Sequence, residues 1–173
     1  MAIKIDFDLK DIDRGMMALQ TELLGLKDGR ASAKAGVLGK ASERTAEPGS
    51  PSAPLSNVDI AMIHEFGADG VPERSFIRAA FDANQAKYID HFRLLVGGIY
   101  DGKLTVSRAL GVIGMETASD IRSLVREGGG IPPPNSPATI AAKGSSHTLI
   151  DTAQLVGAVS HEVLLGSGPK DEE

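Results

Sequence analysis

The stretch SFIRAAFDANQAKYIDHFRLLVGG, residues 75–98, sets the architecture of this chain. Its apolar residues recur at spacings of three and four, which is the periodicity of one face of an α-helix. Ser75 is suited to cap its start and the Gly97-Gly98 pair to end it, so we expect one long helix whose apolar face is interrupted only at Asn84. The apolar positions are Phe76, Ile77, Ala80, Phe81, Tyr88, Phe92 and Leu95.

A second long helix is predicted directly after the first. Thr105 is suited to be its N-cap, and the three glycines at 128–130 end it. Its apolar positions are Val106, Leu110, Ile113, Ala118, Ile121, Leu124 and Val125. Because only the short segment DGKLT separates the two helices, we expect them to pack as an antiparallel pair.

The N-terminal part of the chain predicts strands and one helix. Residues 2–9, AIKIDFDL, alternate with period two, which indicates a strand with one wet face. Its apolar side consists of Ile3, Ile5, Phe7 and Leu9. Spacings of three and four then predict a helix over 10–28. The apolar side of this helix consists of Ile12, Met16, Leu19, Leu23 and Leu26. KAGVLGK, 34–40, indicates a second strand, and residues 41–56, rich in Ser, Pro and Gly, a long mobile loop.

Shorter elements are predicted around the long helices. NVDIAMIHEFGADG predicts a short helix with Asn57 as N-cap and Gly67 as its end, with a strand as the alternative. Pro72 keeps the residue before it extended. Ser136 as N-cap, Pro137 at the first helical position and Gly144 past the end frame a helix of about seven residues.

These elements together predict the α+β class. The last of them is a closing strand over 158–166. We expect a small antiparallel sheet packed against two long helices, with long mobile loops. Residues 1–166 are expected to form one domain that includes the 41–56 loop, and residues 167–173 a polar tail.

Composition narrows the class of protein. The 173 residues are 42% hydrophobic and 24% charged, as one globular domain would be, and only 4% are aromatic. This predicts a thin aliphatic core, with some apolar surface buried against other subunits. The lack of cysteine excludes disulfides, thiolate catalysis and cysteine-ligated zinc.

The charge pattern and the N-terminus suggest where the chain works. The net charge is −5 without a Lys/Arg cluster, so sequence-specific nucleic-acid binding is not expected. No apolar run reaches the length of about 18 residues needed to span a bilayer, and the first residues lack the apolar block of a signal peptide. We therefore expect a soluble protein of the cytoplasm, without a membrane partner.

One short stretch resembles a catalytic loop. Residues 149–153 are LIDTA. This order of two apolar residues, Asp-Thr and a small residue resembles the active-site loop of an aspartic protease. That chemistry needs a glycine where Ala153 stands, and the following residues continue with a helical period. Asp151 and Gln154 instead form the pattern of a capping box, with Ile150 placed to pack against Leu155. We therefore predict an N-cap at Asp151.

The histidines and the glycine-rich stretch GVLGK predict no catalytic, cofactor or metal site. His64-Glu65 lacks the second histidine of a zinc protease, because Ala68 stands at that position, so it is interpreted as a polar pair on a short helix. His91, His147 and His161 show no ligand spacing and are expected to be separate surface or edge residues. GVLGK lacks both the first glycine and the Ser/Thr of a phosphate-binding loop.

Three stretches in order resemble a known family. They are IHEFG, then VPERSFIRAAFD, then PNSPATIAAKGSSHTLIDTAQLVGAVSHEV, and their order and spacing agree with that family across residues 58–162. They are similar to the neck and tail-completion proteins of long-tailed bacteriophages and prophages, whose members show a "hEFG" turn, a "PARPF-RP-F" segment and a "PLSPxTIxxKGSxxPLIDTGxLxxSI" block. The matching residues are His64, Glu65, Phe66, Gly67, Pro72, Arg74, Phe76, Arg78, Phe81, Ser136 to Ile140, Lys143, Gly144, Ser145, Leu149, Ile150, Asp151, Thr152 and Leu155.

The resemblance implies a structural virion protein and no enzyme. Such a subunit assembles as a ring with copies of itself where head and tail meet, and contacts neighbouring neck, connector or tail-tube proteins. DNA is then only cargo passing through the channel, and the protein is located in the virion neck after assembly in the host cytoplasm. Two alternatives stay open: a monomeric adaptor that binds one virion partner through the 41–56 loop, and an aspartic-type protease dimer built on Asp151.

Overall fold

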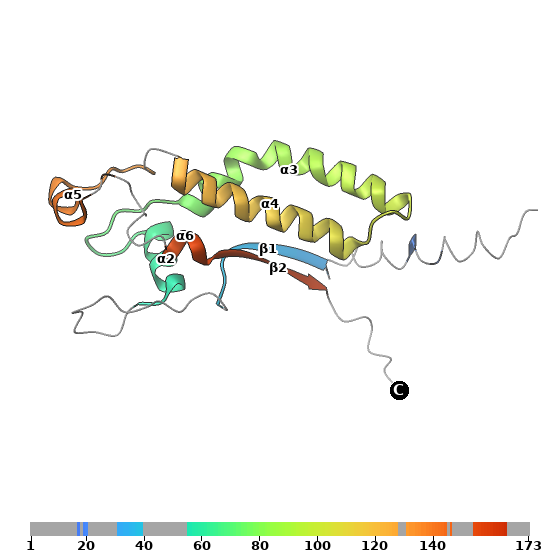
Figure 1. The fold of residues 1–173 in the computed structure, drawn as a ribbon, viewed down its shortest axis with the longest axis horizontal. Helices are drawn as coiled ribbons and strands as arrows, with labels where there is room; N and C mark the ends of the chain where they lie inside the picture. Colours follow the sequence, from blue (N-terminus) through green and yellow to red (C-terminus); the bar gives the residue numbers. More distant parts are fainter. Residues whose placement is uncertain are drawn as a thin grey trace, which may run out of the picture.

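A computed structural model describes the fold of residues 17, 19–20, 31–39, 55–127, 131–144, 146 and 154–165. The elements are β1 (Ala31–Val37), α2 (Asn57–Phe66), α3 (Phe76–Tyr100), α4 (Val106–Glu127), α5 (Pro137–Lys143), α6 (Gln154–Ala158) and β2 (Val159–Leu165). The predicted α+β class is confirmed, because a two-stranded antiparallel sheet packs against the long helix α4, which packs in turn against the long helix α3 (Figure 1).

The described elements form three layers. Helix α4 lies between α3 and the two strands, while α2 and α6 lie at one end of this stack (Figure 1). Helices α3 and α4 run antiparallel, as predicted. Lys87 of α3 contacts Asp120 of α4 at 2.6 Å, and one turn later His91 contacts Glu116 at 2.9 Å. Residue numbers therefore increase along α3 while the numbers of their partners in α4 decrease, as in an antiparallel pair.

The sheet has one face toward the helices and one polar face. Ala31 of β1 lies opposite Leu165 of β2, and Val37 lies opposite Val159. Alternation along a strand places Ala31, Ala33, Ala35 and Val37 on the helix side, where they pack against the core. The other face carries Ser32 and Lys34 of β1 and, on β2, Ser160, Glu162 and Leu164.

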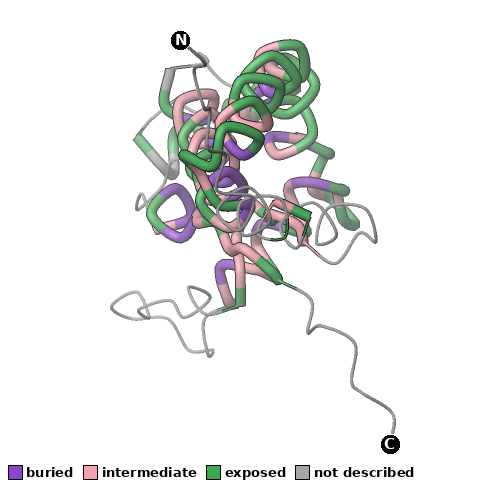
Figure 2. The backbone as a smooth tube through the Cα atoms, turned by 90° about the vertical axis from the view of Figure 1, so that its right-hand side faces the viewer, coloured by how far each residue is buried: buried purple, intermediate pink, exposed green. Residues whose placement is uncertain are grey.

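The core consists of two aliphatic clusters with few aromatic residues. The larger cluster joins α2, α3, α4, α6 and β2. Its buried members are Ala61, Phe76, Ala80, Ala118, Ile121, Val125, Ile131, Leu155, Val156 and Val159. The smaller cluster lies at the turn between α3 and α4 and contains Ile99, Val106, Ala109 and Leu110. Figure 2 shows buried and exposed stretches alternating along the helices.

Several predicted helix ends are confirmed. Thr105 caps α4, since its hydroxyl accepts from the backbone N–H of Arg108 at 3.3 Å. Ser136 caps α5 by accepting from the N–H of Thr139 at 3.1 Å, and Gly144 ends that helix with a φ of 69°. Each cap satisfies a backbone group that the helix end leaves without an intrahelical partner.

The start of α2 differs from the prediction. Its N-cap is Ser56 instead of Asn57: the Ser56 hydroxyl accepts from the N–H of Asp59 at 3.1 Å, and the Asp59 carboxylate accepts from the N–H of Ser56 at 3.2 Å. Asn57 is the first residue of the helix and is buried. The reciprocal capping box gives Ser56 two hydrogen bonds at this position. The alternative of a strand over this stretch is wrong.

Helix α3 ends later than predicted. It continues through Gly97 and Gly98 to Tyr100. Two glycines in a helix cost roughly 1 kcal/mol each relative to alanine. Burial of Ile99, which is 2% exposed, and the hydrogen bond from the Asp101 N–H to the Gly97 carbonyl at 3.0 Å offset this cost.

Two other predictions are corrected at the level of single elements. Strand β1 begins at Ala31 and ends at Val37, although the sequence indicated 34–40. Pairing with β2 fixes these bounds, because strand preference depends strongly on cross-strand contacts. Phe81 and Phe92, predicted on the apolar face of α3, are 47% and 36% exposed. The closing strand agrees with the prediction to within a residue at each end.

Several predictions fall outside the described residues. These are the strand over 2–9, most of the helix over 10–28, residues 41–54 of the loop, the glycines at 128–130 and the tail over 167–173. Of the predicted N-terminal helix, Met17, Leu19 and Gln20 are described and are helical. Leu19 packs against the smaller core cluster. Within the described residues, no helix is both long and apolar enough to cross a membrane.

Candidate functional site

The matching residues of the first two stretches meet at the junction between α2 and α3. Glu65, the penultimate residue of α2, is only 4% exposed. Its carboxylate points to the beginning of α3, where Ser75 is the N-cap position. We call the group formed by Glu65, Ser75, Ile77 and Arg78 the Glu65 junction.

Glu65 caps helix α3 from outside that helix. Its two carboxylate oxygens accept from the backbone N–H of Ile77 at 2.9 Å and of Arg78 at 3.0 Å. The Ser75 hydroxyl, predicted as the cap, makes no cap bond and instead donates to Glu65 at 2.8 Å. A carboxylate at this position satisfies backbone donors at the helix start and interacts favourably with the positive end of the helix dipole.

The environment holds Glu65 in its ionised form. Burial raises the pKa of its carboxyl, but the hydrogen bonds donated by the backbone of Ile77 and Arg78, by the Arg78 side chain and by Ser75 together outweigh burial. The pKa of Glu65 is therefore below its ordinary value of 4.5. This is the opposite of what a general acid at neutral pH requires, so the junction is suited to hold backbone in place.

Arg78 connects the junction to the surface. Its guanidinium donates to the Glu65 carboxylate at 2.9 Å, to the Glu65 carbonyl at 2.7 Å and to Glu73 at 2.7 Å. It also lies over the ring of Phe66, 5.2 Å from the centroid. Phe66 is 64% exposed. The first two matched stretches therefore place an aromatic ring and a cation together on the outside of the molecule.

Arg74 fixes the proline segment against the same junction. Its side chain is buried and donates to the carbonyls of Pro133 at 2.8 Å and Pro134 at 3.3 Å. Its backbone N–H donates to the carbonyl of His64 at 2.6 Å. Arg74 thus joins α2 to the chain just ahead of α5, across about 60 residues of sequence.

Gly67 makes the turn between the two matched stretches possible. Its φ of 78° is in the region that favours glycine, and a Cβ there would lie 3.2 Å from the backbone N of Glu73. A tight turn follows, in which Ala68 and Val71 exchange two backbone hydrogen bonds of 2.9 Å. Pro72 continues the chain as an exposed residue.

The third matched stretch is only partly within the described residues. Ser136, Pro137 and Gly144 frame α5 as predicted, and Lys143 is its last residue. Leu155 in α6 is buried in the larger core cluster with Phe76, and Gln154 is the first residue of that helix. The sites predicted at Ile150, Asp151 and Thr152 lie outside the described residues, so the N-cap at Asp151 stays a prediction.

The structure does not bring the three described histidines into one site. His64, His91 and His161 are on α2, α3 and β2, and His147 lies outside the described residues. His91 is paired with Glu116 of α4. Within the part of the chain that the structure describes, no group of three His, Cys, Asp or Glu residues is placed to hold a metal ion.

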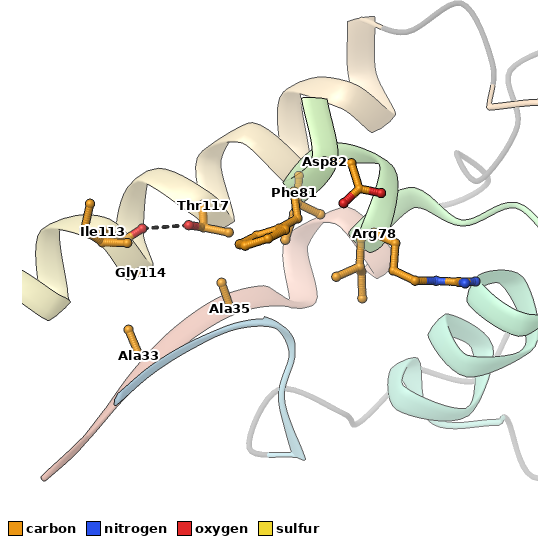
Figure 3. A pocket seen from close by; sticks show the side chains of 10 residues that line it. Ala33, Ala35, Arg78, Phe81, Asp82, Ile113, Gly114 and Thr117 are labelled. Atoms are coloured by element: carbon orange, nitrogen blue, oxygen red, sulfur yellow. Dashed lines mark hydrogen bonds between the residues drawn. The ribbon is translucent and has the colours of Figure 1, made fainter. Parts of the chain in front are cut away.

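A pocket lies beside the sheet, near the Glu65 junction. Its volume is about 300 Å³, and it is lined by one strand, β1, and by α3 and α4 (Figure 3). Its lining is mainly apolar, and its polar residues are Arg78, Asp82 and Thr117. The lining residues are Ala33, Ala35, Ile77, Arg78, Phe81, Asp82, Ile113, Gly114, Thr117 and Ile121. Apolar lining with so few polar groups is suited to apolar side chains more than to a polar substrate.

The comparisons with known proteins add no family. Neither a protein-family model, nor a curated protein, nor a solved structure matches the chain. The function is therefore inferred from the sequence pattern and the geometry described above.

Sequence reasoning missed the role of Glu65. It was interpreted as half of a polar pair, whereas the structure buries it and directs it at α3. Its partners lie 10 to 13 positions further along the chain, beyond the reach of a local capping pattern. The one signal was its place between a helix end and a serine that begins the next helix.

Proposed function

We infer that this chain is a structural protein of the neck of a long-tailed bacteriophage virion. As a ring subunit, it completes the tail or joins the tail to the head connector. The observation that carries this proposal is the order and spacing of the three matched stretches. The residues of the first two stretches form a junction around a buried, ionised glutamate. A junction that holds two helices in place agrees with a structural protein.

The surface supports association between copies. Helix α2 exposes Met62 and Phe66, at 56% and 64%, with Leu55 just ahead of it. Helix α3 exposes a second group, comprising Phe81, Ile89, Phe92, Leu94 and Tyr100. Exposed apolar side chains on two different elements are what a head-to-tail contact between identical subunits needs, since such a contact joins two unlike surfaces.

Sedimentation velocity of the purified chain over a range of concentrations tests self-association. A ring subunit forms a discrete oligomer as concentration rises, and gold-labelled protein added to purified tails binds at one end of each tail. A chain that stays monomeric at every concentration and binds a single virion protein would favour the monomeric adaptor instead.

The protease alternative has its own test at Asp151. A protease dimer predicts that Asp151→Asn keeps the fold and abolishes a pH-dependent cleavage. The predicted N-cap implies that Asp151→Ala lowers stability by about 1 kcal/mol, with no activity to lose. Cleavage of a peptide library by the unmodified chain, lost in Asp151→Asn, would overturn the structural proposal.

A further inference from the structure

The outer edge of β1 is an open strand edge in the part of the chain that the structure describes. β1 pairs with β2 along one side, and within the described residues no strand pairs with its other side. An open edge without proline or a bulge offers backbone donors and acceptors to another strand.

The pocket lies at this same edge. It is lined by Ala33 and Ala35 of β1 but by no residue of β2, and α3 and α4 contribute the rest of its wall (Figure 3). A strand added beside β1 would therefore direct every second side chain toward the pocket. Its other side chains would extend from the polar face of the sheet, beside Ser32 and Lys34.

Residues 2–9 have the pattern that this position requires. Their apolar residues alternate with Lys4, Asp6 and Asp8. The apolar side chains suit the apolar wall of the pocket. The two aspartates carry the charge opposite to that of Lys34, which is exposed on the polar face of the sheet. The segment has eight residues and β1 has seven, so the two are of similar length.

The connection to β1 favours a second copy as the source of this strand. The predicted helix over 10–28 is about 28 Å long. To bring the strand parallel to its own β1, this helix would have to cross one face of the sheet. One face is covered by α4. The other face carries mainly Ser32, Lys34 and Glu162, which are poor packing partners for the apolar side of a helix.

An antiparallel arrangement within one chain is also unfavourable. It would need both ends of the predicted helix at the same end of β1, although about 28 Å separates them. Leu19, in the middle of that helix, packs instead with the cluster of Ile99 and Leu110 at the turn between α3 and α4.

We propose that residues 2–9 of a neighbouring copy add a third strand to the outer edge of β1, with the apolar side of that strand filling the pocket. Main-chain hydrogen bonds to β1 supply affinity, and the alternating side chains supply the register. The inference deepens the proposed function by naming one contact between subunits. It rests on self-association alone and not on a place in the virion.

Because the chain contains no cysteine, single-cysteine variants test the contact directly. Full-length Lys34→Cys is mixed with each of Lys4→Cys, Asp6→Cys and Asp8→Cys, one partner carrying a mass tag, under mild oxidation. We expect a disulfide between tagged and untagged chains for at least one of the three positions. Ile5→Cys, on the opposite side of the same strand, and Ala141→Cys, exposed on α5, are the matched controls.

The outcomes separate this contact from the proposed function. A mixed dimer above the level of both controls supports the contact. A disulfide only within one chain, shown by double-cysteine variants, overturns the assignment to a second copy. No disulfide above the controls overturns the third strand itself. Phe7→Asp provides a second readout: it should weaken association while circular dichroism is unchanged, and unchanged association would contradict the proposal. A positive disulfide with no binding to tails would leave the contact standing while the virion role fails.

Discussion

Replacing Glu65 by glutamine removes the charge on which the junction between α2 and α3 depends. Glutamine has the same size and keeps one acceptor oxygen, but its NH₂ group faces donors where the second carboxylate oxygen was. In the native chain those two oxygens accept from the backbone N–H of Ile77 and of Arg78. At least one backbone donor at the start of α3 loses its partner in the variant.

The expected cost follows from these contacts. A buried hydrogen bond to a charged acceptor contributes about 1.5–3 kcal/mol, and an unpaired buried donor carries a similar penalty. The side chain of Arg78 is 53% exposed, so solvent screens its share and we leave it out. Losing one backbone bond and weakening the other gives a decrease in unfolding free energy of about 2–3 kcal/mol. For a chain of this size that corresponds to a Tm lower by roughly 4–12 °C.

The same variant has a signature in its pH dependence. The pKa of Glu65 is lowered in the folded chain, so its ionised form stabilises the fold. That contribution is complete above the unfolded-state pKa near 4.5 and is lost as pH falls through the folded-state value. The stability gap between native chain and Glu65→Gln should therefore be constant at neutral pH and shrink below about pH 4.5.

Urea unfolding at several pH values measures both effects. Glu73→Gln is the matched control, because it removes an exposed partner of the same arginine and should cost no more than about 0.5 kcal/mol. Equal losses in the Glu65 and Glu73 variants, or a gap that stays constant down to pH 3, would refute the assignment of Glu65 as the cap of α3.

Three further changes have defined outcomes. Gly67→Ala should lower stability by about 1–3 kcal/mol in thermal unfolding, since its φ of 78° and the 3.2 Å approach to Glu73 N strain any side chain. Ser136→Ala should raise hydrogen exchange across α5 with a cap loss of about 1 kcal/mol, and unchanged exchange would contradict the cap. Burial and Asp120 raise the pKa of Tyr88, so Asp120→Asn should ionise Tyr88 at lower pH than the native chain in ultraviolet titration.

The long helices were predictable because their signals are local. The period of apolar residues identified α3 and α4, and the short connection between them predicted the antiparallel pair. Ser136 and Gly144 carry cap patterns that depend only on neighbours in sequence, and the structure confirms them. The closing strand β2 was also recognisable from its apolar run.

Features that depend on distant contacts were not predictable. α3 passes Gly97 and Gly98 because the burial of Ile99 outweighs the low helix propensity of glycine. The bounds of β1 are set by its pairing with β2, which is more than 120 residues away in the sequence. The candidate site followed the same rule: Glu65 and Arg78 were identified by resemblance, but the burial of Glu65 and its bonds to Ser75, Ile77 and Arg78 needed the fold.

The proposed role in joining head and tail is tested most directly by electron microscopy of particles produced without this protein. The account predicts separate filled heads and tails of finished length, and restored joining when the chain is supplied again. Normal virions in its absence would contradict the account.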